Sequence, residues 1–138
     1  MDAKAVRQIM EAALEARENA YAPYSGFSVG AALLCEGDEI ITGCNVENAS
    51  YPAGMCAERT AVFSAVARGK REFRALAVAG GKTGSAPSDH CMPCGMCLQV
   101  ISEFCPPDFE IYVAKIAEEV QCYRLRDLLP HVFDSLEK

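Results

Sequence analysis

Basic side chains are scarce in this chain, and long apolar runs are missing from it. Lysine and arginine total 13 against 19 aspartate and glutamate residues, which leaves a net charge of −6. Proteins that follow a nucleic-acid backbone normally present a basic patch, so this balance argues against that class. No apolar run approaches the roughly 20 residues that a helix needs to cross a membrane. We therefore expect no nucleic-acid partner and no membrane span.

The chain also lacks the opening of a secreted protein, in which a basic segment is followed by an apolar one. Three of its eight cysteines fall in metal-type spacing. The other five stand singly in apolar or strand-like stretches, where cysteine is more often a small buried hydrophobe than a disulfide partner. Those five are Cys35, Cys44, Cys105, Cys122 and Cys91, of which the last is the one most worth checking. We expect a cytoplasmic protein without disulfide bonds.

The chain does contain enough apolar material for one packed core. About half of the 138 residues are apolar, and no low-complexity tract interrupts them. A chain of this length buries roughly two thirds of its unfolded surface on folding. We expect a single domain that spans residues 1–138.

Apolar periodicity predicts an alternation of helices and strands. The predicted strands are residues 27–35, 39–46, 73–80, 109–115 and 120–125. The predicted helices are residues 3–19, one beginning at each of two cysteine stretches, and a short tail from 126. Helical crossovers favour parallel strands, whereas the turn at Gly37-Asp38 and the short connection before 120 favour antiparallel pairs. The fold class is α/β, a three-layer α/β/α sandwich with a five-stranded mixed β-sheet.

Two further expectations concern the helices that begin at the cysteines. The strands that precede them should lie side by side, which places the site at the carboxyl ends of strands. The first of these helices is apolar nearly all round between Ala61 and Ala67, so we expect it to be buried centrally.

The two cysteine stretches are Cys56-Ala57-Glu58-Arg59 and Pro93-Cys94-Gly95-Met96-Cys97. Each opens a predicted helix, where free N–H groups and the positive end of the helix dipole favour a thiolate. Three thiolates bind zinc tetrahedrally and leave a fourth position for water, as in catalytic zinc sites. The alternative is a redox-active pair of cysteines and one unrelated buried thiol. The added Cys56-x-Glu58 element favours Cys56, Cys94 and Cys97 as zinc ligands.

Glu58 and Arg59 follow the first ligand directly. Glu58 lies close enough to reach a zinc-bound water without ligating the metal, although a first-turn acid that favours the helix dipole is the ordinary alternative. Three thiolates leave the metal centre with a net charge of −1, and Arg59 is the obvious cation to offset it. A solvated helix residue is the alternative for Arg59. His90 and His131 are the only histidines, and we assign neither to the metal and expect both in surface loops.

A His or Cys followed by x-Glu, and later Pro-Cys-x-x-Cys, is the signature of the zinc deaminases. From about residue 21 to 133 the chain also resembles the short, all-cysteine cytidine deaminases. The matching stretches are Asn45-Val46-Glu47-Asn48-Ala49, Cys56-Ala57-Glu58-Arg59-Thr60-Ala61, Pro93-Cys94-Gly95-Met96-Cys97 and Leu128-Leu129-Pro130. This resemblance implies a zinc hydrolase of pyrimidine salvage that converts cytidine and 2′-deoxycytidine to uridine and 2′-deoxyuridine, with one Zn²⁺ per subunit. It also implies a homotetramer in which neighbouring subunits complete each active site.

The resemblance further implies a role for each residue of the site. Glu58 shuttles protons while hydroxide attacks C4 of the pyrimidine, and Arg59 donates to the ligand sulfurs. Asn45 and Glu47 bind ribose hydroxyls; ordinary strand-end polarity is their alternative. The remaining implied contacts are Phe27 and the backbone N–H of Ala57 with the base, and Tyr51 and Phe133 in a neighbouring subunit's pocket, with simple core packing as the alternative for these last two.

Leu98 departs from the pattern, because the family commonly has arginine directly after the last cysteine. Without that arginine the site loses a possible second cation to neutralise the thiolates, or the assembly loses an interface contact. The reaction class is less affected. Three other functions compete. One is deamination of another cytosine-bearing small molecule, the second is a non-catalytic module with a structural zinc or redox dithiol, and the third is nucleic-acid editing. The acidic balance disfavours the last of these.

Overall fold

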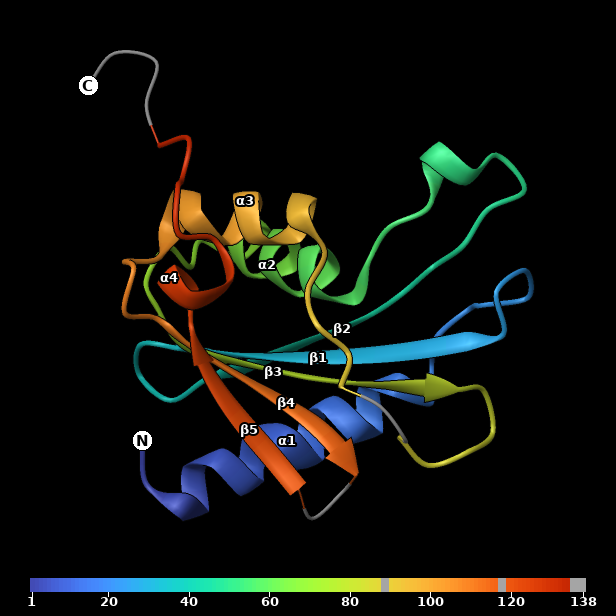
Figure 1. The fold of residues 1–138 in the computed structure, drawn as a ribbon, viewed down its shortest axis with the longest axis horizontal. Coiled ribbons are helices and arrows are strands. Elements are labelled where there is room, and N and C mark those ends of the chain that lie inside the picture. Colours follow the sequence, from blue (N-terminus) through green and yellow to red (C-terminus); the bar gives the residue numbers. More distant parts are fainter. Residues whose placement is uncertain (88–89, 117–118, 135–138) are drawn as a thin grey trace.

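Five strands form one mixed sheet with helices on both faces (Figure 1). The computed structural model describes residues 1–87, 90–116 and 119–134. The strands are β1 (Phe27–Cys35), β2 (Ile40–Cys44), β3 (Phe73–Lys82), β4 (Glu110–Ile116) and β5 (Glu119–Arg124). The helices are α1 (Ala3–Arg17), α2 (Ala57–Ala67), α3 (Gly95–Phe104) and α4 (Leu125–Leu128), with the 3-10 turn η1 at Tyr51–Ala53. The predicted α/β class and the five strands are confirmed.

Strand alternation divides the core into the two halves of a sandwich. Along β1 every second residue from Val29 to Cys35 packs in a core that includes residues of α2 and α3. The intervening residues Ala32 and Leu34 pack with Ile9, Met10 and Ala13 of α1 on the opposite face. Successive strand side chains point to opposite faces, so a strand buried on both sides is apolar throughout. Figure 1 shows α1 below the sheet and the two cysteine-bearing helices above it.

Helix α1 approaches the sheet unusually closely. A Cβ on Gly30 would lie 2.0 Å from the carbonyl oxygen of Ala13, so only glycine fits under the helix there. Arg17, the last residue of α1, is buried and donates from Nε to the Ser28 carbonyl at 2.9 Å and from Nη2 to the Lys82 carbonyl at 2.8 Å. These bonds hold the helix to the ends of β1 and β3 that lie nearest the site.

The strand order differs from the expected one. The sheet runs β2-β1-β3-β4-β5, so β1 lies between the two strands that precede the cysteine-bearing helices. The expectation that those strands lie side by side is wrong. The nine-residue β1 is buried at eight positions and pairs antiparallel with both neighbours, whereas the five-residue β2 stays at the edge. The parallel pair is β3–β4, joined through α3, and β4–β5 is antiparallel as predicted.

Helix α2 is buried on one side only. Ala61, Val62 and Ala65 face the core, whereas Phe63 is 45% exposed and Ala67 is exposed. The expectation of a helix buried all round is therefore wrong for this chain, because only one side of α2 rests on the sheet. Within the residues that the structure describes, no helix is long and apolar enough to cross a membrane.

Candidate active site

Three cysteine sulfurs meet where α2 and α3 begin. Cys56 is the N-cap of α2 and Cys94 is the N-cap of α3, with Cys97 one turn further on. The Sγ atoms of Cys56 and Cys94 are 4.0 Å apart, and those of Cys94 and Cys97 are 3.4 Å apart. Sulfurs held about 2.3 Å from a tetrahedral zinc lie roughly 3.8 Å from one another, so the cluster fits the ion. Among the described residues no fourth His, Cys, Asp or Glu joins it.

The guanidinium of Arg59 contacts the sulfur cluster. Nη2 of Arg59 donates to Sγ of Cys56 at 3.5 Å. Hydrogen bonds from Cys97, and then from Arg59 and Cys94, lower the pKa of the Cys56 thiol to about 5. The same bond to Cys56 raises the pKa of Arg59, which stays charged. The interpretation of Arg59 as a solvated helix residue therefore does not hold, because its guanidinium is directed to a ligand sulfur.

Glu58 is a buried carboxyl beside this cluster. Its side chain is 4% exposed, and burial, with a smaller contribution from the charge of Cys56, raises its pKa to about 7. It is not among the clustered ligand atoms. A carboxyl that titrates near neutral pH both accepts and releases protons readily, as a general acid and base must. Burial argues against a first-turn acid that simply faces solvent.

A cavity of about 450 Å³ opens beside the cluster, between the loop after α1 and the loop before α2. Asn45, Glu47 and Tyr51 line it together with Cys56 and Arg59. Its volume lies in the range usual for small-molecule sites. The structure thus brings the two predicted ribose-binding side chains to the same cavity as the first metal ligand.

Asn45 and Glu47 also hold the cavity wall in place. Asn45 accepts from the Val29 N–H at 2.8 Å and donates to the Phe27 carbonyl at 2.9 Å. The carboxylate of Glu47 accepts the N–H groups of Tyr24 and Ser25, at 3.0 Å each, and the Ser25 hydroxyl. These bonds, the one from the Ser25 hydroxyl first, lower the pKa of Glu47 and keep it ionised.

The comparisons with known proteins agree with this geometry. Residues 3–113 match a family model described as the cytidine and deoxycytidylate deaminase zinc-binding region. A cytidine deaminase of Halalkalibacterium halodurans is 42% identical over 129 residues, which cover 94% of each chain. The chain belongs to the cytidine and deoxycytidylate deaminase family.

Solved structures of the family share the fold. A cytidine deaminase from Burkholderia pseudomallei is 45% identical, with a TM-score of 0.84 over 96% of this chain and 100% of that one. The enzyme from Mycobacterium tuberculosis is 36% identical, with a TM-score of 0.79 over 94% of this chain and 98% of that one. The chain is therefore an enzyme of a zinc-binding deaminase family, and its three-sulfur cluster could hold the metal.

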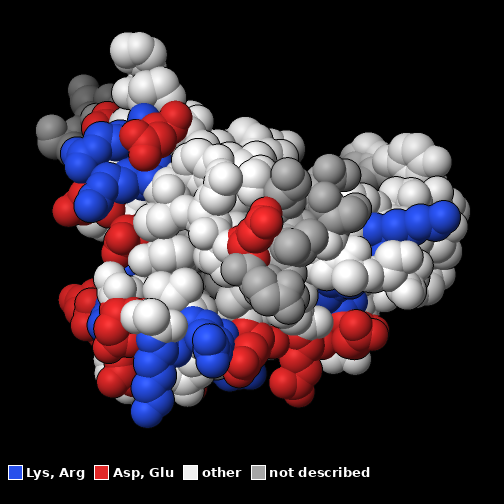
Figure 2. Space-filling view, turned by 60° about the horizontal axis from the view of Figure 1, so that its bottom comes forward, with Lys and Arg blue, Asp and Glu red and all other residues white. Residues whose placement is uncertain are grey.

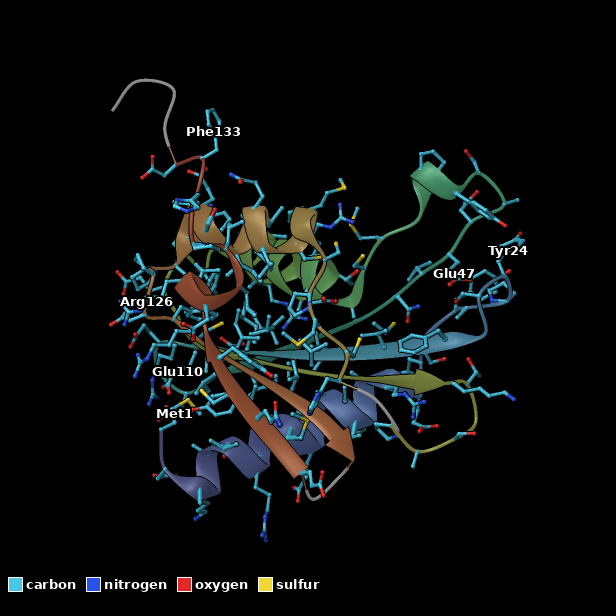
Figure 3. The ribbon with its side chains drawn as sticks, in the orientation of Figure 1. Met1, Tyr24, Glu47, Glu110, Arg126 and Phe133 are labelled. Carbon is cyan, nitrogen blue, oxygen red and sulfur yellow. The ribbon has the colours of Figure 1, made fainter. Side chains whose placement is uncertain are left out.

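Two aromatic residues of this deaminase stand apart from its core. Tyr51 is 75% exposed and packs its ring edge against Tyr24, with centroids 5.9 Å apart. Phe133 is 65% exposed, and its carbonyl accepts from Nε2 of Gln99 at 2.8 Å. Figure 3 shows Phe133 at the opposite side of the chain from Glu47 and Tyr24. Simple core packing is therefore excluded for both aromatic residues, and one chain does not bring Phe133 to its own cavity.

The other predicted positions of the deaminase are placed as follows. Ala57 is buried as the first residue of α2, so its N–H is one of the donors that a helix start leaves without an intrahelical partner. Phe27 is 37% exposed at the start of β1. Leu98 packs in the core beneath α2 and α3, so no polar group is buried where an arginine is common.

His90 and the free cysteines complete the comparison with prediction. His131 is exposed as expected; His90 lies in a loop as expected but is half-buried, with its Nε2 buried and without a hydrogen-bond partner among the described residues. All eight cysteines are free thiols. Sequence reasoning did not single out Tyr24 and Ser25, although a polar turn between α1 and β1 was the signal available.

Proposed function

We propose that this protein is a cytidine deaminase, which hydrolyses cytidine and 2′-deoxycytidine to uridine and 2′-deoxyuridine and releases ammonia. One observation carries the proposal above all. The buried carboxyl of Glu58, with its pKa near 7, lies in the first turn of the same helix whose N-cap Cys56 belongs to the sulfur cluster. A proton carrier and a three-ligand metal site are thus adjacent, as hydrolysis at C4 of a pyrimidine requires.

Each residue then has a defined task. Cys56, Cys94 and Cys97 would hold the zinc, which would supply a water activated near neutral pH. Glu58 accepts a proton from the attacking water and gives it to N3 as the new C4–O bond forms. It then takes the proton of the new C4 hydroxyl and delivers it to the exocyclic nitrogen as the C4–N bond breaks, so that the C4 carbonyl forms and ammonia leaves. Arg59 balances part of the thiolate charge.

The substrate in this proposal is a free nucleoside. Asn45 and Glu47 bind ribose hydroxyls, Phe27 packs against the base, and the Ala57 N–H donates to it. In the described part of the chain, Arg59 is the cation that lines the cavity, and it is committed to Cys56. A 5′-phosphate would therefore meet the carboxylate of Glu47 without a free cation to offset its charge.

Larger nucleic-acid substrates fit less well. Figure 2 shows that, among the described residues on the face in view, lysine and arginine side chains stand next to acidic ones. A strand of nucleic acid is normally held by a continuous basic surface. This distribution supports a small-molecule substrate over editing of a polynucleotide.

We also propose that the single domain, residues 1–138, works as a cytoplasmic homotetramer. The exposed apolar side chains Phe63 and Met96 lie on α2 and α3, and Phe133 stands far from the cavity of its own chain. In the proposed assembly Tyr51 and Phe133 complete the pocket of a neighbour. Light scattering after size exclusion tests this, because four chains of 14.9 kDa total about 60 kDa.

The function is tested by incubating the zinc-loaded protein with cytidine and following both ammonia release and the ultraviolet change to uridine. Glu58→Gln should retain stoichiometric zinc and the native circular dichroism spectrum but lose turnover. A non-catalytic zinc module or a redox dithiol would show no turnover even in the wild type. Parallel assays with cytosine and with a cytosine compound that lacks ribose separate a nucleoside enzyme from one for another cytosine-bearing molecule.

A further inference from the structure

We propose that Cys91 forms, with Phe27 and Gly80, the wall of the active site that limits which groups can be attached near C4 of the pyrimidine. This inference rests on the proposed function and deepens it, because it assigns a determinant of tolerance for modified cytidines. No role in the reaction described above belongs to Cys91 or Gly80.

The three residues share one face of the sheet. Phe27 lies two residues before Val29, and Gly80 lies two residues after Val78, both of which pack in the core with α2 and α3. Because side chains two apart on a strand share a face, Phe27 and Gly80 face the layer that carries the cysteine helices. The strands pair antiparallel there, with Val29 opposite Gly80.

Gly80 allows the thiol and the aromatic ring to meet. A Cβ added at Gly80 would lie 2.6 Å from Sγ of Cys91 and 2.9 Å from Cε2 of Phe27. Both side chains therefore converge on the space above the Gly80 α-carbon. Any larger residue at position 80 would displace the thiol or the ring from this space.

The Cys91 thiol lies close enough to Glu58 and Cys56 for their charges to act on it. Burial raises its pKa to about 12, and the next contributions come from the negative charges of Glu58 and Cys56. Cys91 stays protonated and is not part of the sulfur cluster. Its side chain is therefore a compact, uncharged group that meets the Phe27 ring above Gly80 and lies within reach of the charges of Glu58 and Cys56, and we place C4 and its substituents beside it.

A wall of this kind discriminates between cytidines by the size of the groups attached near C4. One methyl group gained or lost in a tight apolar pocket changes relative rates by roughly ten- to 200-fold. Replacing Cys91 by alanine removes one sulfur atom, which is about the space of a methyl group. Valine at the same position adds a branch and narrows the wall.

The test compares Cys91→Ala and Cys91→Val with the wild type, each as the zinc-loaded full chain. The measured quantity is kcat/KM for 5-methylcytidine and for N4-methylcytidine, each divided by kcat/KM for cytidine. We expect Cys91→Ala to raise at least one of the two ratios about tenfold and Cys91→Val to lower it. The matched control is Cys105→Ala, which removes another partly buried thiol from the same core at the far end of α3 and should leave both ratios unchanged.

The outcomes separate the inference from the proposed function. If cytidine is deaminated but neither ratio moves in folded, zinc-loaded Cys91→Ala, the wall is assigned wrongly and the function stands. If the wild type does not deaminate cytidine, the proposed function fails. The assignment of Cys91 to the wall is then tested separately by calorimetry, as the affinity for 5-methyluridine divided by that for uridine, compared between Cys91→Ala and the wild type. Should Cys91→Ala fail to fold, Cys91→Ser replaces it, with the same expected direction of change.

Discussion

At the scale of single residues, the site depends on side chains that do two things at once. Cys56 caps a helix and offers a sulfur, while Glu47 lines the cavity and fixes the Tyr24–Ser25 turn. A substitution at such a position therefore changes both chemistry and stability. The two effects can be separated only by measuring both.

Glu58 shows this most clearly. The folded protein holds its proton more tightly than the unfolded chain does, because burial raises the pKa of Glu58 from 4.5 to about 7. Stability of the metal-free protein should therefore fall as pH rises from about 4.5 to 7, and the full penalty, up to about 3 kcal/mol, remains above that range. Glu58→Gln removes the ionisation, so metal-free Glu58→Gln should exceed the wild type in free energy of unfolding at pH 8 and match it near pH 4.

Urea denaturation at a series of pH values measures this difference. Glu103→Gln, which changes an exposed carboxyl on α3, serves as the control and should follow the wild type. A difference between Glu58→Gln and the wild type that does not vary with pH would contradict the assignment.

Glu47→Gln tests the second residue with two functions. The amide keeps one oxygen acceptor but cannot accept the Ser25 hydroxyl on its nitrogen. Because a charged acceptor binds a hydroxyl more strongly than a neutral one, we expect kcat/KM for cytidine to fall roughly 10-fold, mainly through a higher KM. Steady-state kinetics and a thermal melt are measured together, with the exposed Glu36→Gln as the control. A lower melting temperature with an unchanged KM would show that Glu47 stabilises the fold but does not bind the substrate.

Sequence reasoning succeeded best at this scale. The proposed ligand set Cys56, Cys94 and Cys97 was predicted from the Cys94-x-x-Cys97 spacing together with Cys56-x-Glu58 and the zinc-deaminase signature, and the structure brings these three sulfurs together. The engagement of Asn45 with two backbone groups of β1 could not be predicted in this way. Those partners are 16 and 18 residues away, and only the hairpin brings them together.

At the scale of helices and strands, glycine governs how closely the layers approach. A Cβ on Gly30 would lie 2.0 Å from the Ala13 carbonyl oxygen, which is backbone and cannot rotate away. Gly30→Ala should therefore separate α1 from β1 and lower the free energy of unfolding by about 3 kcal/mol. Gly95→Ala is the matched control, because nothing lies within 4 Å of its added carbon. Equal midpoints of urea unfolding for the two variants would show that α1 can move away from β1 without loss of stability.

The order of strands was the main failure of prediction at this scale. Periodicity identifies strands and their buried faces, but it carries no information on which strand lies next to which. Two helical crossovers were expected to give adjacent parallel strands. Only the crossover from β3 to β4 does so, because β1 takes the place beside β3 that β2 was expected to occupy.

At the scale of the whole molecule, one chain leaves apolar side chains uncovered around the site. Phe63→Glu places a charge on the exposed side of α2. In the proposed tetramer this charge would be buried without a partner, so the assembly should dissociate to smaller species and kcat/KM for cytidine should fall at least tenfold. Light scattering and kinetics on the same sample give both quantities.

Gln8→Glu provides the comparison, because it changes the net charge by the same amount on the exposed side of α1. It should leave both the molar mass and the kinetics unchanged. A fully active monomer of Phe63→Glu would show that each chain completes its own pocket.

The hydrogen bond from Gln99 to Phe133 gives α3 a second attachment. The start of that helix supplies two of the clustered sulfurs. Gln99, two residues beyond Cys97, is hydrogen-bonded to the segment around Phe133. Ordering of the helix start should therefore propagate to that segment. Amide hydrogen–deuterium exchange around Val132 and Phe133 should slow when Zn²⁺ is added to the metal-free protein. Gln99→Ala should abolish this slowing. The exchange rate at Val132 and Phe133 would then indicate whether the metal site is occupied.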